Sequence, residues 1–154
     1  MAVLRIRLVL IILLMLVTGI LADFTIMAAD LYFRGIDGNY KINTRYIFVE
    51  GDGHLNCNNL WSIPAWFESI DVSGDKQGVR YKGIRPLDPE LIEFNTDFGH
   101  YTMYKDRDYH LAALDDEDSG HCRVVNSFTR NCHYEGNRLV VKSIVRCTTD
   151  TVRL

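Results

Sequence analysis

The sequence predicts an all-β domain, an antiparallel sandwich or barrel, because it combines strand-like alternation with frequent turn residues and has no long helical periodicity. The alternation is clearest over residues 40–48, where one face carries Tyr40, Ile42, Thr44, Tyr46 and Phe48. A period of two marks a half-buried strand. Short apolar segments bounded by turn residues recur along the chain, a spacing typical of antiparallel all-β folds.

Further strands are expected at 24–33, 67–72, 79–84, 91–95, 101–105, 109–114, 122–128 and 139–147. Turns rich in glycine, proline and aspartate separate them, at 35–38, 51–53, 74–78, 86–89, 97–99 and 115–120. The segment 138–146 also fits a helix, although its β-branched residues favour a strand.

The N-terminal segment 1–22 has the organisation of a secretory signal peptide. Arg5 and Arg7 precede an apolar run that ends at Asp23. This run is shorter than the ~20 residues that a membrane-crossing helix needs. We expect cleavage before Asp23, or at Ala28 or Ala29, with an uncleaved anchor as the alternative. The protein is then secreted, without a stable membrane anchor, as a single β-rich domain of residues 23–154.

The charge of this domain excludes one class of partner. Removal of Arg5 and Arg7 leaves 15 basic and 20 acidic side chains. A protein that binds nucleic acid without regard to sequence needs a basic face to neutralise phosphates. We therefore expect no nucleic-acid partner.

Four cysteines, Cys57, Cys122, Cys132 and Cys147, lie within the domain. An even number of cysteines in an exported chain indicates two disulfides, and three pairings are possible. The polar stretch 126–131 fits a hairpin that would bring Cys122 and Cys132 together. A zinc site built from these two residues and their neighbouring histidines is disfavoured, because the chain has no C-x-x-C pair.

The sequence carries no catalytic motif: there is no G-x-S-x-G, phosphate-binding loop, H-E-x-x-H or EF-hand loop. The five histidines are scattered singly. The acidic run 115–118 lacks the spaced ligands that would surround Ca²⁺ and fits a solvated hairpin tip. We expect a protein that is not an enzyme and that has no metal or cofactor.

Three segments resemble the lipocalin family. They are K-G-I through L-D-P-E-L-I-E-F at 82–94, H-Y-T-M-Y-K at 100–105, and D-R-D-Y-H-L-A-A-L at 106–114. The last is similar to the family's T-D-Y-like motif and the small and apolar residues that follow it. The resemblance implies an eight-stranded up-and-down barrel with one closed end and a mouth that admits a small apolar ligand.

The resemblance also suggests which residues bind and how the cysteines pair. A secreted carrier of a small hydrophobic ligand would line its cavity with inward side chains from Phe48, Trp66, Tyr81, Phe94, Met103 and Leu111. Trp66 would lie near the mouth, and Trp61 would be peripheral. Lipocalin-like proteins often tie an early strand region to the C-terminal segment, which implies Cys57–Cys147 and leaves Cys122–Cys132.

An alternative function remains open at this point. An extracellular β-sandwich would use Trp61, Trp66 and Phe67, which surround Pro64, as exposed anchors for a protein partner. A carrier would turn these rings inward, whereas a partner-binding surface would leave them exposed.

Overall fold

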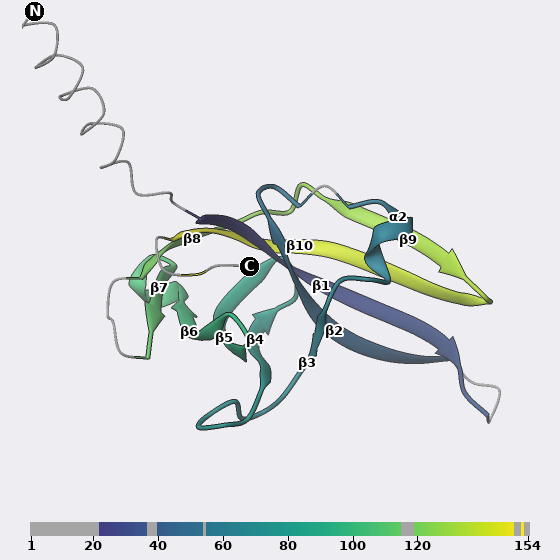
Figure 1. Cartoon of the computed structure of the whole chain (residues 1–154), viewed down its shortest axis with the longest axis horizontal. Coiled ribbons are helices and arrows are strands. Elements are labelled where there is room, and N and C mark those ends of the chain that lie inside the picture. Colours follow the sequence, from purple (N-terminus) through teal and green to yellow (C-terminus); the bar gives the residue numbers. More distant parts are fainter. Residues whose placement is uncertain (1–21, 37–39, 54, 115–118, 150–151, 153–154) are drawn as a thin grey trace, which may run out of the picture.

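The computed structural model describes residues 22–36, 40–53, 55–114, 119–149 and 152. The expected signal segment, except Ala22, and the acidic run 115–118 lie outside these residues. The elements are β1 (Ala22–Arg34), β2 (Tyr40–Glu50), α2 (Cys57–Leu60), β3 (Ala65–Phe67), β4 (Gly78–Ile84), β5 (Asp88–Thr96), β6 (Gly99–Tyr104), η1 (Lys105–Arg107), β7 (His110–Ala113), β8 (Gly120–Val124), β9 (Thr129–Tyr134) and β10 (Asn137–Thr149) (Figure 1).

The strands form a nearly closed barrel in up-and-down order. Nine of them follow the order β3-β2-β1-β10-β8-β7-β6-β5-β4, and this antiparallel sheet curves through 296°. The predicted all-β barrel is therefore confirmed, with nine strands rather than eight, and the sandwich does not form. The tenth strand, β9, pairs with the first half of β10. In Figure 1, β1, β2, β9 and β10 extend beyond the barrel.

The barrel closes at a weak seam between β3 and β4. An odd number of strands cannot alternate in direction all the way round, so one neighbouring pair must be parallel. This pair is β3–β4, which is joined by a single parallel bridge from Glu68 to Val79. The Ser69 backbone N–H donates to the Val79 carbonyl over 2.9 Å.

The strand predicted at 67–72 is wrong beyond Phe67, for a topological reason. A parallel junction needs a return connection instead of a tight hairpin, and residues 68–77 supply it. Val72 anchors this connection by burying its side chain. Asp71 shapes its turn by accepting a hydrogen bond from the Ser73 backbone N–H over 2.9 Å.

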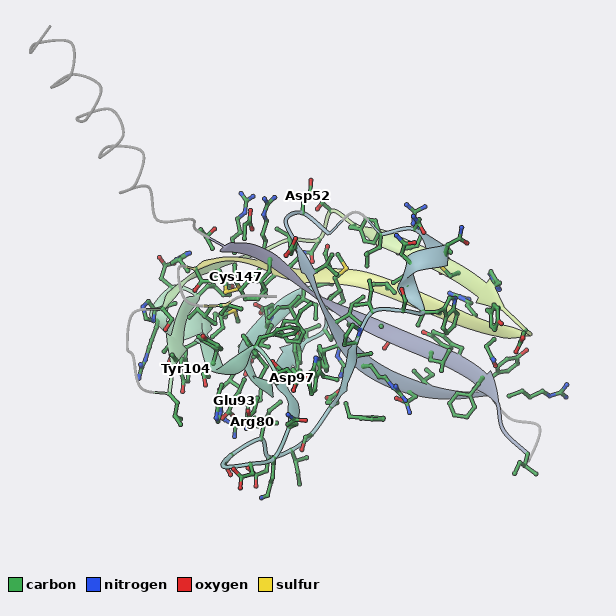
Figure 2. The ribbon with its side chains drawn as sticks, viewed as in Figure 1. Asp52, Arg80, Glu93, Asp97, Tyr104 and Cys147 are labelled. Carbon is green, nitrogen blue, oxygen red and sulfur yellow. A yellow bond between two sulfur atoms is a disulfide. The ribbon has the colours of Figure 1, made fainter. Side chains whose placement is uncertain are left out.

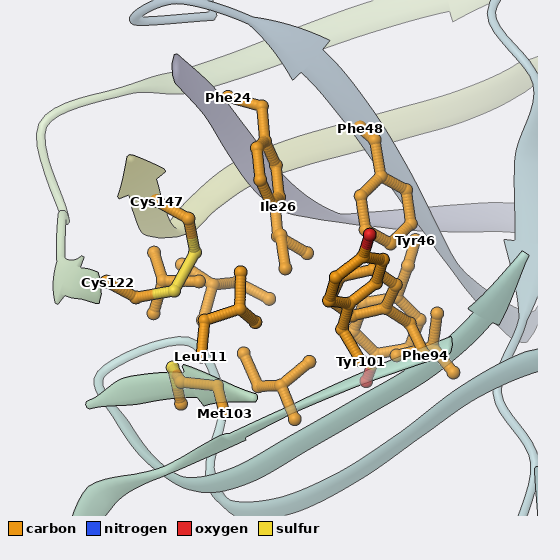
Figure 3. Close-up of a cluster of buried hydrophobic side chains, with 14 of the residues drawn as sticks. Phe24, Ile26, Tyr46, Phe48, Phe94, Tyr101, Met103, Leu111, Cys122 and Cys147 are labelled. Atoms are coloured by element: carbon orange, nitrogen blue, oxygen red, sulfur yellow. A yellow bond between two sulfur atoms is a disulfide. The ribbon is translucent and has the colours of Figure 1, made fainter. Parts of the chain in front are cut away.

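The barrel interior is filled by one apolar cluster (Figure 3). The predicted alternation of β2 is confirmed for Tyr46 and Phe48, which both point inward, whereas Tyr40 and Ile42 are exposed. The ring centroids of Phe48 and Phe94 lie 4.9 Å apart, and those of Phe94 and Tyr101 lie 5.4 Å apart. The buried members are Phe24, Ile26, Ala28, Tyr46, Phe48, Val79, Ile92, Phe94, Tyr101, Met103, Leu111, Cys122, Ile144, Val145, Cys147 and Val152.

A second apolar cluster lies on the outer face of the same sheet. Met27 and Ala29 alternate with the interior residues of β1 and point outward, and Ile47 does the same on β2. The segment that contains α2 covers them with Leu55 and Leu60. Residues 24–29 of β1 are therefore buried on both faces, which explains why this stretch is mostly apolar.

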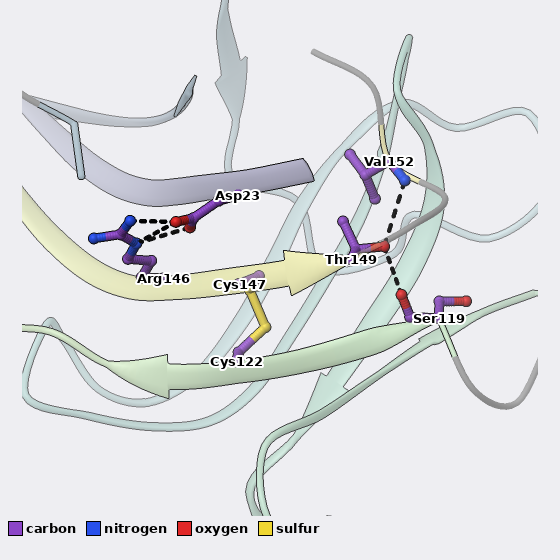
Figure 4. Close-up of a disulfide and its surroundings, with 7 residues drawn as sticks. All are labelled: Asp23, Ser119, Cys122, Arg146, Cys147, Thr149 and Val152. Atoms are coloured by element: carbon purple, nitrogen blue, oxygen red, sulfur yellow. Dashed lines mark hydrogen bonds and ion pairs between the residues drawn. A yellow bond between two sulfur atoms is a disulfide. The ribbon is translucent and has the colours of Figure 1, made fainter. Parts of the chain in front are cut away.

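The disulfides join Cys57 to Cys132 and Cys122 to Cys147. The predicted pairing is wrong because Cys122 and Cys132 point to opposite faces. Cys122 belongs to the interior cluster, where it lies opposite Cys147 in the β8–β10 register (Figure 4). Cys132 belongs to the outer cluster, next to α2. The Cys57–Cys132 disulfide therefore fastens α2 to β9.

The C-terminal region also departs from prediction in part. The expected hairpin at 126–131 is wrong, because the chain turns instead at Glu135 and Gly136, both with positive φ. The segment 138–146, for which the sequence allowed a strand or a helix, is a strand. β10 pairs with β1 along one edge and with β8 and β9 along the other, and a helix would satisfy none of these ladders.

Two residues outside the strands pack against the interior cluster. Val152 is buried in it, and its backbone N–H donates to Thr149 Oγ1 over 3.4 Å (Figure 4). Arg85 lies over the rings of Tyr46 and Tyr81. Within the described part of the chain, neither helix combines the length and apolar character needed to cross a membrane.

Candidate functional site

The six side chains predicted to line a cavity all meet in the barrel interior. Phe48, Phe94, Met103 and Leu111 are buried members of the interior cluster, and the half-buried Trp66 and Tyr81 pack against it. Figure 2 shows side chains crowding the space between these strands. The six residues thus form much of the packed core, and their contact with a ligand stays a prediction.

A polar cluster bridges the β3–β4 seam beside this core. The Tyr46 hydroxyl donates to Glu68 Oε2 over 3.3 Å, and Arg85 Nη2 donates to Glu68 Oε1 over 3.2 Å. The Tyr46 and Tyr81 rings are stacked with their centroids 6.1 Å apart. Burial raises the pKa of Tyr81 to about 12 and raises that of Tyr46 well above its usual range. Side chains therefore hold the seam where the backbone ladder is interrupted.

An open groove lies outside the barrel, between the α2 segment and the outer face of β1, β2 and β10. We call it the outer groove. Its volume is about 230 Å³. Most of its surface is apolar. The groove lies beside α2, where the side chains of the outer cluster leave space unfilled. The lining residues are Ala29, Leu31, Arg45, Ile47, Leu60, Trp61, Ile63, Ala65 and Leu139.

Exposed aromatic rings surround the outer groove. Trp61 is 44% exposed and its ring lies 5.4 Å from that of Tyr134, which is 54% exposed. Phe67 is 56% exposed, and the Arg45 guanidinium carbon lies 4.2 Å from its ring centroid. Trp61 and Phe67 therefore face outward, while Trp66, from the same sequence segment, faces the interior.

The prediction from sequence missed the lining of the outer groove, apart from noting Trp61. A signal was nevertheless present. Ile47 interrupts the alternation of β2, and Leu139, Val140 and Val141 form a continuous apolar run on β10. Such runs indicate a strand that is covered on both faces. They do not indicate which distant segment provides the cover.

A further group of polar side chains is centred on Glu93, whose side chain is 14% exposed. Glu93 contacts Arg80 over 2.5 Å and His100 over 3.0 Å, and Arg80 and Glu93 lie together at the edge of the molecule in Figure 2. Among the described residues, no three His, Cys, Asp or Glu side chains are grouped so that they would hold a metal ion.

No protein-family model, curated protein or solved structure matches this chain. The fold and the site therefore define its class: a small, nearly closed antiparallel β-barrel with two disulfides and an apolar outer groove. Two disulfides in a domain of this size indicate folding in an oxidising compartment.

Proposed function

We propose that this chain is a secreted, lipocalin-like binding protein that takes up a small, mostly apolar molecule in its outer groove. The observation that carries the proposal is the groove itself, a concave site in which seven of nine lining residues are aliphatic. Binding sites for small molecules are typically concave and apolar, with few polar groups. Burial of apolar surface would supply the affinity.

The outer groove is a better candidate than the barrel interior. A ligand in the interior would have to displace Phe48, Phe94 and Tyr101, whose rings are already in contact. Displacing well-packed side chains costs free energy, because protein interiors are close-packed. The outer groove requires no such rearrangement. Its volume is below the ~300–1,000 Å³ of sites for drug-sized ligands, which favours a short chain or a small ring.

The secretion part of the proposal has two supports. The apolar segment that precedes Asp23 has the length and flanks of a signal peptide. All four cysteines are in disulfides, which persist outside the cytosol.

The site is tested with N-phenyl-1-naphthylamine, a neutral apolar probe whose emission rises on binding. We expect saturable binding to the wild-type protein. Trp61→Ala, which removes one wall of the outer groove, should weaken binding at least about fivefold, equivalent to about 1 kcal/mol. Trp66→Ala should leave the affinity unchanged, because Trp66 packs inside the barrel.

The matched tryptophan variants also locate the site if the proposal is wrong. Weaker binding only in Trp66→Ala would move the ligand to the barrel interior. A folded wild-type protein that binds no probe would exclude small-ligand binding of this kind. Ala65→Phe, which places a ring in the outer groove from β3, should also prevent the probe from binding there.

A second candidate function rests on the exposed rings. Trp61, Phe67 and Tyr134 surround the outer groove, and exposed aromatic residues often anchor protein partners. In this alternative the groove receives a side chain of an extracellular protein. Cross-linking in extracellular fluid should then trap a defined partner with the wild-type protein but not with the double variant Trp61→Ala/Phe67→Ala.

A further inference from the structure

Arg45 is a cation in an otherwise apolar site. It lies on β2, opposite Ala29 on one side and Phe67 on the other, and its side chain forms part of the wall of the outer groove. Stacking of the guanidinium on the Phe67 ring holds the side chain in place. The remaining lining residues carry no charge.

Arg45 also has unused hydrogen-bonding capacity. Its Nε–H is inaccessible to solvent and has no hydrogen-bond partner. Arg80 and Arg85 also have an unpaired Nε, but each binds a carboxylate through another nitrogen. Among the described residues, no acidic side chain is paired with Arg45. A buried donor without a partner is unfavourable, and this penalty would fall if the guanidinium turned toward an acceptor on a ligand in the groove.

The geometry points to the chemical class of the ligand. We infer that the outer groove binds a small monocarboxylic acid with an apolar chain or ring, with its carboxylate on Arg45 and its apolar part against residues such as Leu31, Ile47 and Leu60. The planar guanidinium matches the two oxygens of a carboxylate. A doubly charged phosphate is less suited, because the lining offers a single cation. This inference rests on the proposed function of the same groove.

The test compares octanoate with 1-octanol, which have the same chain length but different head groups. Each competes with bound N-phenyl-1-naphthylamine at pH 7, using wild-type protein, Arg45→Met, Arg45→Lys and Arg130→Met. Arg130 is the matched control, because it also lies over an aromatic ring, that of Phe128, but is outside the groove lining.

We expect Arg45→Met to weaken octanoate binding at least tenfold and to change octanol binding by less than threefold. The octanoate affinity of Arg45→Lys should lie between those of the wild type and Arg45→Met. Arg130→Met should bind both ligands as the wild type does. Equal weakening of both ligands in Arg45→Met, or octanol binding without octanoate binding, would overturn the inference while leaving the groove as an apolar site. Failure of the probe and both ligands to bind the folded wild type would overturn the proposed function as well.

Discussion

At the residue scale, the seam depends on side chains whose protonation matters. Tyr46 and Tyr81 stack on each other, Arg85 lies over both rings, and Glu68 accepts hydrogen bonds from Tyr46 and Arg85. A tyrosine that is buried in the folded state resists ionisation, because the charged form is poorly solvated there. The seam should therefore be sensitive to alkaline pH.

The protein should lose stability as the pH rises above about 10. The pKa of Tyr81 is raised from its ordinary value of 10.0 to about 12, and that of Tyr46 is raised further. The unfolded chain then releases these protons first, so the stabilisation is complete below pH 10 and declines as pH rises toward the folded-state pKa. Urea unfolding at pH 8, 10 and 11 measures the decline.

Two phenylalanine variants separate this effect from general alkaline denaturation. Tyr46→Phe should show a shallower decline between pH 8 and 11, at the cost of about 1 kcal/mol for the lost hydrogen bond to Glu68. Tyr40→Phe, at an exposed position, should retain the wild-type decline. Parallel declines in the wild type and Tyr46→Phe would argue against a role for the seam.

At the element scale, the β4–β5 hairpin needs a glycine at its bulge. The register shifts between Lys82 and Gly83, where Gly83 has φ +112°. A Cβ atom there would lie 2.2 Å from the Asp88 carbonyl oxygen and 2.7 Å from the Glu90 nitrogen. Both are backbone atoms of the partner strand, so they cannot move aside without breaking the ladder.

Gly83→Ala should therefore destabilise the protein by about 2–3 kcal/mol, through the steric clash and the positive φ together. Gly74→Ala is the matched control. Gly74 also has positive φ, at +60°, but no atom lies within 4 Å of its added Cβ, so the loss should be near 1 kcal/mol. Urea unfolding curves measure both, and equal losses would contradict the clash.

The helix α2 should support ligand binding in the outer groove only while the Cys57–Cys132 disulfide fastens it to β9. Removing Cys57–Cys132 with the double variant Cys57→Ala/Cys132→Ala releases this connection, which spans 75 residues. We expect weaker binding of N-phenyl-1-naphthylamine and a stability loss of about 4–5 kcal/mol in the chain-entropy model. Fluorescence titration and near-UV circular dichroism measure the two effects.

The other disulfide supplies the control. Cys122→Ala/Cys147→Ala opens a 25-residue separation inside the barrel and should cost about 3–4 kcal/mol in the same model. Its affinity for the probe should remain close to wild type, because neither cysteine lines the outer groove. Comparable weakening of binding in both double variants would mean that α2 is not a specific part of the site.

At the scale of the whole molecule, β1 connects the two apolar clusters. Phe24 and Ile26 belong to the interior, and Met27 and Ala29 belong to the outer cluster. At the start of the strand, the Asp23 carboxylate accepts a hydrogen bond from Arg146 Nε over 2.7 Å (Figure 4). Cleavage after Ala28 or Ala29 would remove side chains that both clusters need.

The mature protein should therefore begin at or within a few residues of Asp23. N-terminal sequencing of the secreted form measures this directly. A chain expressed from Asp23 into an oxidising compartment should fold with both disulfides, whereas one that begins at Asp30 should fail to form them correctly. Secretion of a stable protein that begins at Asp30 would contradict the central role of β1.

Much of the fold is predictable from local patterns. The inward side chains of Tyr46 and Phe48 on β2 and the mostly apolar stretch 24–29 of β1 both correspond to their burial. The strand β9 was missed, because Thr129 to Tyr134 is mostly polar and exposed and has little apolar pattern to detect. The candidate site was harder, since Leu31, Ile47, Leu60 and Leu139 come from four separate segments.

The sequence by itself determined the all-β class, most of the strands, and the use of all four cysteines in disulfides. Only the tertiary structure decided the closure at β3–β4, the pairing of Cys57 with Cys132, and the position of the outer groove. The physical reason is the range of the interactions. A period of two shows that residues alternate between faces, but it does not specify what covers each face. The cover on β1 and β2 is the α2 segment, which is held by a cysteine 75 residues away.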